Sequence, residues 1–312
     1  LNLEGIWTRY ADADAVLDEI ASLPPEKATR RMQELYAEPV KPELITRRIA
    51  EINDSGVVSC ASVTPQRTKA HLEHILAGEL DILVVQGTVV SAEHVSTTVE
   101  PLDLKALVRS LDIPVILGGC ATYKAALHLM RTGAAGVLVG VGPGQACTTR
   151  GVLGLGVPQA TAIADVRAAR MRHLDETGVY CQVIADGGMA TGGDVAKAIV
   201  CGADAVMIGS PLAAAAEAPG RGHHWGMATF HPTLPRGARV ETTVRGTLEE
   251  ILLGPANEND GRMNLFGALR SSMATCGYVD IKEFQKAEVM VAPALQTEGK
   301  SLQRSQGVGM GR

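Results

Sequence analysis

Short apolar segments alternate with helical segments through the middle of the chain. Six of them have the length and β-branched content of buried strands: 57–63, 81–85, 114–117, 137–141, 183–185 and 205–208. Helical patterns separate them, for example 123–131 and 193–201. Apolar strands that alternate with helices are typical of a parallel sheet whose faces are covered by helices. The pattern therefore predicts an α/β fold.

The segments outside these units have other patterns. Residues 11–54 are charged and helical in pattern, and 265–275 predict a further helix. The stretch 222–264 is rich in Gly, Pro and polar residues, and we expect a flap or insertion there, with a loop over 223–245. Residues 293–312 are polar and predict a disordered tail. We expect residues 1–292 to form one catalytic domain.

Two architectures accommodate six strand–helix units. A doubly wound open sheet uses about six strands, whereas a closed (β/α)8 barrel needs eight. The spacing of the units leaves both open.

Composition narrows the classes of partner. The chain has 312 residues, a formal net charge of −5 and 3% aromatic residues, which argues against nucleic-acid binding. No apolar run approaches the roughly 20 residues that a membrane span needs. The cysteines have no close-paired spacing, so we expect reduced thiols in a cytoplasmic protein; they are Cys60, Cys120, Cys147, Cys181, Cys201 and Cys276.

One loop combines glycines with a cysteine at the end of a predicted strand. Residues 139–150 read VGVGPGQACTTR, and the glycines allow sharp turns close to a ligand. Chemistry in α/β enzymes is placed at this end of the strands, so Cys147 is a candidate nucleophile. The alternative is a buried cysteine that acts as a small hydrophobe. Thr149 either assists the chemistry or bonds its own backbone.

Two later strands also end in polar, glycine-rich residues. Asp186 offers acceptors for ribose hydroxyls, and the amides of Gly187 and Gly188 can approach a phosphate. Gly209 and Ser210 follow the next strand, which makes a pair of strand ends of the kind that binds phosphate in barrels. The alternative is a tight turn in which Asp186 caps the next helix.

These motifs carry a family resemblance. GPGQACTTR followed by GVLGLGVPQATAI resembles the active-site loop of the IMP dehydrogenase/GMP reductase family. VIADGGM, GADAVMIGSPLA, WGM at 225–227 and the stretch 266–284 are similar to other segments of that family. The chain most resembles the branch without the regulatory CBS domain. The resemblance implies a (β/α)8 TIM barrel whose first one or two strands lie ahead of Leu1.

The resemblance also implies an activity, the NAD-dependent oxidation of IMP to XMP in guanine nucleotide synthesis. Cys147 would attack C2 of the purine, a hydride would leave, and the covalent thioimidate would be hydrolysed with help from Thr149. Asp186 would hold the ribose, and the strand-end glycines with Ser210 would hold the phosphate. The implied nucleotide set is Asp186, Gly187, Gly188, Met207, Gly209, Ser210, Gly226, Met227 and Glu241.

Further ligands are implied in the same way. The dinucleotide, NAD or NADP, would meet Gln86, Gly87, Thr88, Gly140 and Gly142. A potassium ion would be bound by the backbone carbonyls of Gly142, Gly144 and Cys147. Relatives form tetramers, so we expect a homotetramer.

The chain departs from the family pattern mainly on the dinucleotide side. Gln86 stands where relatives have aspartate, Cys120 where they have asparagine, Leu138 where they have Arg or Lys, and Gln145 where they have serine. The flap lacks the Arg-Tyr pair that activates water, for which we consider Arg236, Arg239 and His231. We expect His223 and His224 to be solvated. A GMP reductase that uses NADPH, or a non-catalytic nucleotide-binding paralogue, remain alternatives.

Overall fold

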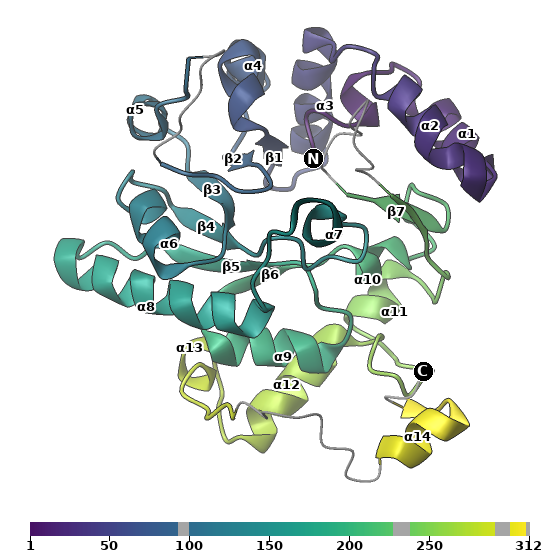
Figure 1. Cartoon of the computed structure of the whole chain (residues 1–312), viewed down its shortest axis with the longest axis vertical. Helices are drawn as coiled ribbons and strands as arrows, with labels where there is room; N and C mark the ends of the chain where they lie inside the picture. The colour runs from purple at the N-terminus through teal and green to yellow at the C-terminus, as the bar shows by residue number, and fades with distance from the viewer. Residues whose placement is uncertain (93–99, 227–237, 291–299, 310–312) are drawn as a thin grey trace.

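Six parallel strands form one curved sheet in consecutive order (Figure 1). In a doubly wound fold the strand order reverses within the sheet, so the consecutive order identifies the winding of a barrel. The computed structural model describes residues 1–92, 100–226, 238–290 and 300–309. The strands are β1 Cys60–Val63, β2 Ile82–Gln86, β3 Val115–Cys120, β4 Gly136–Val139, β5 Gln182–Asp186 and β6 Ala205–Met207.

The first residues of the chain extend this sheet beyond β1. The Leu3 amide donates to the Ser62 carbonyl (2.9 Å), and the Ser62 amide donates to the Leu1 carbonyl (2.7 Å). Asn2 and Ser62 form a parallel bridge. Residues 1–3 thus occupy a further strand position. The described residues form a partial (β/α)8 barrel of six strands and this short segment, rather than the closed ring of eight.

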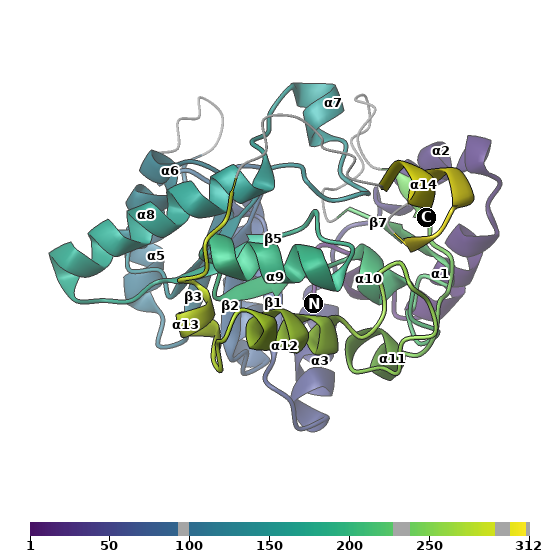
Figure 2. The same cartoon turned by 90° about the horizontal axis from the view of Figure 1, so that it is seen from below.

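Helices connect successive strands and lie on the outer face of the sheet (Figures 1 and 2). Leu83, Leu117, Val137 and Val183 of the sheet are fully buried, as expected for strands covered on both faces. The short helix α7, Thr149–Leu153, stands apart from the outer helices, at the rim of the fold in Figure 2. The outer helices are α4 Pro65–Ala77, α5 Leu104–Ser110, α6 Tyr123–Met130, α8 Gln159–Thr177 and α9 Gly192–Cys201.

The N-terminal helical pattern is confirmed. A 3-10 turn η1 (Ile6–Thr8) precedes three helices, and α1 and α2 enclose a second small core around Ile20 and Met32. Prolines occupy the first turns of α2 and α3, where their missing amide hydrogen costs nothing. The three helices are α1 Ala13–Ser22, α2 Pro25–Leu35 and α3 Pro42–Asp54.

The region after β6 differs from the sequence expectation. The predicted loop 223–245 contains an antiparallel hairpin of two three-residue strands, β7 His223–Trp225 and β8 Arg239–Glu241. Strands this short carry no detectable periodicity, so the sequence could not reveal them. The remaining helices are α10 Ser210–Ala213, α11 Leu248–Leu252, α12 Leu265–Thr275, α13 Ile281–Phe284 and α14 Lys300–Gln306.

Two other boundaries need correction. The predicted strand 57–63 begins only at Cys60, because Val57 and Val58 are 59% and 67% exposed and have no sheet partner among the described residues. The tail 293–312 contains α14, whose sequence KSLQRSQ includes several good helix formers.

Of the described helices, none has the length and apolar character needed to cross a membrane.

A buried ionic network lies at the amino-terminal ends of the strands. Arg170 of α8 is 2% exposed and donates to Asp204 at 2.7 Å. Asp204 also accepts from the Tyr180 hydroxyl (2.7 Å), from the Val183 amide (2.8 Å) and from Lys282 of α13. This network ties α8, α13 and the starts of β5 and β6 together.

Candidate active site

The glycine-rich loop leaves the carboxyl end of β4 in direct contact with β5. Gly140 has φ +148°, and a Cβ atom there would lie 2.4 Å from the Asp186 carbonyl oxygen. Only glycine fits this close approach. The start of the loop is therefore fixed against the residue that was predicted to bind ribose.

The structure brings the side chains of Cys147 and Thr149 together. The Cys147 amide donates to the Gly144 carbonyl (3.0 Å), which closes a turn, and its Sγ lies 3.2 Å from Oγ1 of Thr149. Thr149 begins α7 and is buried, whereas Cys147 is half-buried and so remains accessible.

Two other cysteines of the sheet region differ from Cys147 in environment. Cys120 and Cys181 are buried, and this burial raises the pKa of each thiol to about 12. A thiol with such a pKa is almost entirely protonated at neutral pH and is a poor nucleophile. These two cysteines therefore act as small core residues, the role that we considered as the alternative for Cys147.

The Gly187-Gly188 turn packs against the cysteine loop. Both glycines have positive φ, +79° and +81°, and a Cβ atom on Gly188 would lie 2.9 Å from Cβ of Pro143. The Gly187 amide donates to the carbonyl of Met207 at the end of β6 (2.9 Å). The ends of β4, β5 and β6 therefore form one continuous surface around this turn.

Asp186 is a half-buried carboxylate of this surface. Burial raises its pKa from 3.8 to about 6, and a hydrogen bond from Gln86, 3.0 Å from Nε2 to Oδ2, opposes that rise. The side chain does not cap the next helix, because Thr191 is the N-cap of α9 and forms a capping box with Asp194. The helix-capping alternative for Asp186 is therefore wrong.

Asp186→Asn is expected to stabilise the protein at neutral and alkaline pH. The folded-state pKa lies above the unfolded value, so ionisation of Asp186 costs stability as pH rises through about 6. The interval from 3.8 to about 6 sets an upper bound of about 3 kcal/mol on the gain. Urea unfolding at pH 4 and pH 8 measures it. A variant that is no more stable than the wild type at pH 8 would contradict this account.

Ser210 contacts a histidine side chain that we expected to be solvated. His224 of β7 is half-buried, with Nε2 3.3 Å from Oγ of Ser210 and Nδ1 2.5 Å from Oγ1 of Thr242. Burial lowers the pKa of His224, so the ring is mainly neutral at pH 7. The expectation of a solvated His224 is wrong, because the hairpin that carries it was not detectable from the sequence.

The hairpin is anchored to the N-terminal helices. The Trp225 indole donates to the Tyr36 hydroxyl (2.7 Å), and Arg239 donates to the carbonyls of Ile20 and Leu23, the latter at 2.7 Å. The Arg239 guanidinium is thereby bound to the end of α1, so it is not available to activate water.

The remaining predicted residues of this region lie as follows. Glu241 is exposed and pairs with His223, so strand alternation puts its side chain on the opposite face of the hairpin from His224. Gly226 lines a cavity of about 680 Å³ between the hairpin, the N-terminal segment and α10, together with Trp7, His224 and Leu212. Met227, His231 and Arg236 lie outside the described residues.

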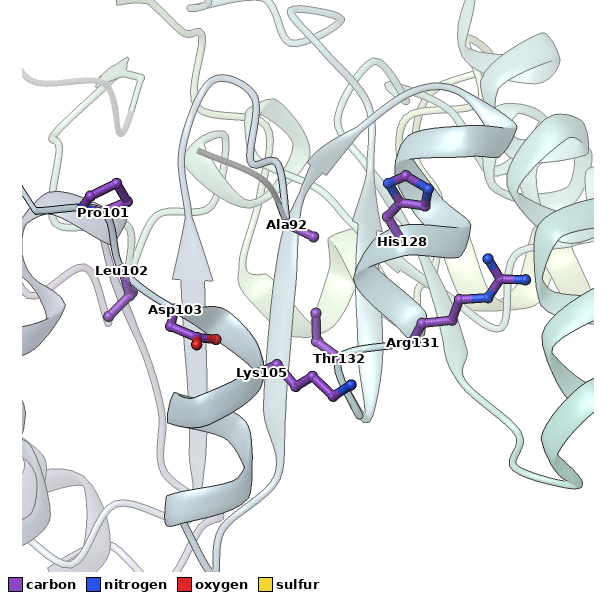
Figure 3. Close-up of a pocket in the computed structure, with 8 residues that line it drawn as sticks. All are labelled: Ala92, Pro101, Leu102, Asp103, Lys105, His128, Arg131 and Thr132. Atoms are coloured by element: carbon purple, nitrogen blue, oxygen red, sulfur yellow. The ribbon is translucent and has the colours of Figure 1, made fainter. Parts of the chain in front are cut away.

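A separate cavity of about 460 Å³ lies between α5 and the end of α6 (Figure 3). Its lining residues include Asp103, Lys105, His128 and Arg131, and Arg131 is paired with Glu176 at 2.8 Å. No predicted site residue lines it, so this cavity is distinct from the surface around Cys147.

Three of the predicted dinucleotide residues form hydrogen bonds within the protein. The side chain of Gln86 bonds to Asp186, the Gly87 amide donates to Gly118 (2.8 Å), and the Gly140 amide donates to Cys120 (2.8 Å). Gly119 also donates to the Gly87 carbonyl at 3.1 Å. These contacts join the ends of β2, β3 and β4, and the dinucleotide role of this set stays a prediction.

The potassium prediction involves backbone carbonyls of the cysteine loop. Gly142 has φ +71°, and the Gly144 carbonyl already accepts from the Cys147 amide at 3.0 Å. A carbonyl oxygen has a second lone pair, so this bond is compatible with a cation ligand. Within the described residues, no cluster of three or more His, Cys, Asp or Glu side chains offers a metal site. The potassium site stays a prediction.

The sequence is similar to proteins of one family. A sequence model of the IMP dehydrogenase / GMP reductase domain matches residues 38–301. An uncharacterized oxidoreductase of Mycobacterium leprae is 50% identical over 301 residues, which are 94% of this chain and 80% of that protein. An inosine-5'-monophosphate dehydrogenase of Methanocaldococcus jannaschii is 32% identical over 276 residues, covering 77% of this chain and 51% of that enzyme.

A solved structure supports the same assignment. The crystal structure of an IMP dehydrogenase/GMP reductase-like protein from Corynebacterium glutamicum superposes with a TM-score of 0.87 at 46% identity. The match covers 94% of this chain and 78% of that protein. The family match spans most of the chain, and the winding of the sheet agrees with it. The chain therefore belongs to the IMP dehydrogenase/GMP reductase family.

Proposed function

We propose that this protein is a purine-nucleotide oxidoreductase that oxidises IMP to XMP through a covalent bond to Cys147. The observation that carries the proposal is the contact between the cysteine loop and the Asp186-Gly187-Gly188 turn, where Pro143 packs on Gly188. A nucleophile and a ribose-and-phosphate surface are thereby held together at one end of the sheet. This end is where barrel enzymes place their chemistry.

The nucleotide would be held at its ribose and phosphate. The Asp186 carboxylate accepts from the ribose hydroxyls, and the Gly187-Gly188 turn, with no side chains, lets the backbone approach the phosphate. Ser210 lies at the adjacent strand end, and His224 beside it supplies a second polar group on the phosphate side. His224 is thus a member of the proposed site that the motifs did not reveal.

Cys147 is the proposed nucleophile. Its sulfur adds to C2 of the purine, the C2 hydride leaves, and water then cleaves the carbon–sulfur bond of the thioimidate to release XMP and the thiol. A nicotinamide dinucleotide, when bound, accepts the hydride. Thr149, with Oγ1 3.2 Å from Sγ, is placed to exchange a proton with the sulfur or with the attacking water.

A second candidate is the reduction of GMP. In that direction Cys147 would displace ammonia from C2, and a hydride, which NADPH would supply when bound, would then add at C2 and release the thiol to give IMP, so no water needs to be activated. The specific observation in its favour is the commitment of Arg239 to the end of α1, which removes one of the groups considered for water activation. The proposed nucleotide contacts are the same for both reactions.

Absorbance at 340 nm distinguishes the candidates. The protein is mixed with IMP, NAD and potassium, and separately with GMP and NADPH, each beside Cys147→Ala. A rise with IMP that requires Cys147 supports the dehydrogenase, and a fall with GMP supports the reductase. If neither mixture changes while IMP protects Cys147 from alkylation, the protein is a non-catalytic nucleotide binder and the proposal is wrong.

A further inference from the structure

One hydrogen bond crosses the interior of the partial barrel. Gln86 ends β2 and Asp186 ends β5, with β3 and β4 between them in the sheet, yet Nε2 of Gln86 lies 3.0 Å from Oδ2 of Asp186. Residues on strands that are not neighbours can meet in this way only across the concave side of the sheet. The bond therefore lies inside the curve, at the end that carries the cysteine loop.

We propose that Gln86 is a positioning residue for the nucleotide ribose, rather than a dinucleotide ligand. Its amide holds Oδ2 of Asp186 and so fixes the carboxylate plane, which leaves Oδ1 and the second lone pair of Oδ2 for the ribose hydroxyls. This inference rests on the proposed function, in which Asp186 binds ribose. It assigns Gln86 to the nucleotide half of the site.

A second glutamine holds the main chain of the same residue. Nε2 of Gln159 lies 2.6 Å from the Val139 carbonyl oxygen and 3.3 Å from the Asp186 carbonyl oxygen. The Gln159 amide also packs against Gly140. Asp186 is thus held at its backbone by Gln159 and at its carboxylate by Gln86. A carboxylate constrained at both points loses little freedom when a nucleotide binds, which favours affinity.

An amide suits this position better than an acid. Among the described residues, the groups shown to approach Asp186 from neighbouring elements are Gln86 of β2, Gly140 after β4, Gln159 of α8 and Met207 of β6, and none of these is charged. A carboxyl in place of the Gln86 amide would put two acids about 3.0 Å apart, and such a pair shares a proton. The amide supplies a donor without a second charge.

The test compares IMP binding by Gln86→Leu, Gln86→Glu and the wild type in titration calorimetry at pH 6 and pH 8.5. Gln66→Leu, on the exposed part of α4, is the matched control and should bind as the wild type does. Gln86→Leu should weaken IMP binding about 2- to 10-fold, because the Asp186 carboxylate would then have to be ordered when the nucleotide binds. Gln86→Glu should bind far better at pH 6 than at pH 8.5, a change that a merely structural role would not produce.

A deoxynucleotide shows whether the loss of affinity depends on the ribose 2′-hydroxyl. If Gln86 acts through the ribose contact, Gln86→Leu should weaken 2′-deoxy-IMP less than it weakens IMP. Equal IMP affinity for wild type and Gln86→Leu, with no added pH dependence in Gln86→Glu, would overturn the inference while the proposed function stands. Failure of the wild type itself to bind IMP would instead overturn the proposed function, and the inference with it.

Discussion

Replacement of Cys147 by alanine is expected to reduce nucleotide turnover by at least about 10⁴-fold, since the nucleophile would be lost and the other cysteines of the chain do not lie on this loop. Cys120 and Cys181 are buried with pKa values of about 12, and neither lies on the loop. IMP affinity should change by less than about threefold, because the proposed grip on ribose and phosphate uses Asp186 and Ser210. Steady-state rates and titration calorimetry measure the two quantities.

The control for this experiment is Cys276→Ala. Cys276 is an exposed free thiol that follows α12, so its removal should leave both rate and affinity unchanged. A Cys147→Ala enzyme that keeps more than a tenth of the wild-type rate would show that the chemistry does not pass through this sulfur. Loss of IMP binding in the variant would show that Cys147 shapes the nucleotide site.

The second large effect is on stability. Asp204→Ala is expected to lower the free energy of unfolding by about 3–5 kcal/mol, because Arg170, 2% exposed, would keep its charge in the core without its carboxylate partner. Tyr180 and Lys282 would lose the same acceptor. Urea unfolding at pH 7 measures the change.

The matched control is Asp165→Ala on the exposed face of α8, which should change the free energy of unfolding by less than about 0.5 kcal/mol.

The stabilisation that Asp204 provides is also expected to depend on pH. Although burial alone would raise its pKa, hydrogen bonds from Lys282, the Val183 amide and Tyr180 lower it overall, so this stabilisation is lost as pH falls below about 3.8. A loss of less than about 1 kcal/mol at pH 7 would contradict the account.

The strands and the cysteine loop were predictable because their signals are local. Buried parallel strands appear as continuous apolar runs, and β2 to β6 lie within a few residues of those runs. The glycines that turn the chain next to Cys147 can also be recognised without a partner. The Cys147–Thr149 contact follows from a separation of two residues along the chain.

The parts that were not predictable depend on distant residues. The bond between Gln86 and Asp186 joins residues 100 positions apart, and nothing in either segment indicates the other. The place of His224 depends on a hairpin whose strands have three residues each. The choice between a doubly wound sheet and a barrel depended on strand order, which the spacing of the units does not determine.

The central claim is that Cys147 carries the purine nucleotide as a covalent thioimidate at C2. Peptide mass spectrometry on acid-quenched turnover mixtures tests it most directly, because IMP after hydride loss and GMP after ammonia loss give the same adduct. We predict that the peptide containing Cys147 carries this nucleotide mass during turnover in at least one of the two mixtures, and that Cys147→Ala carries none. Measurable turnover with the Cys147 peptide unmodified in both mixtures would contradict the claim.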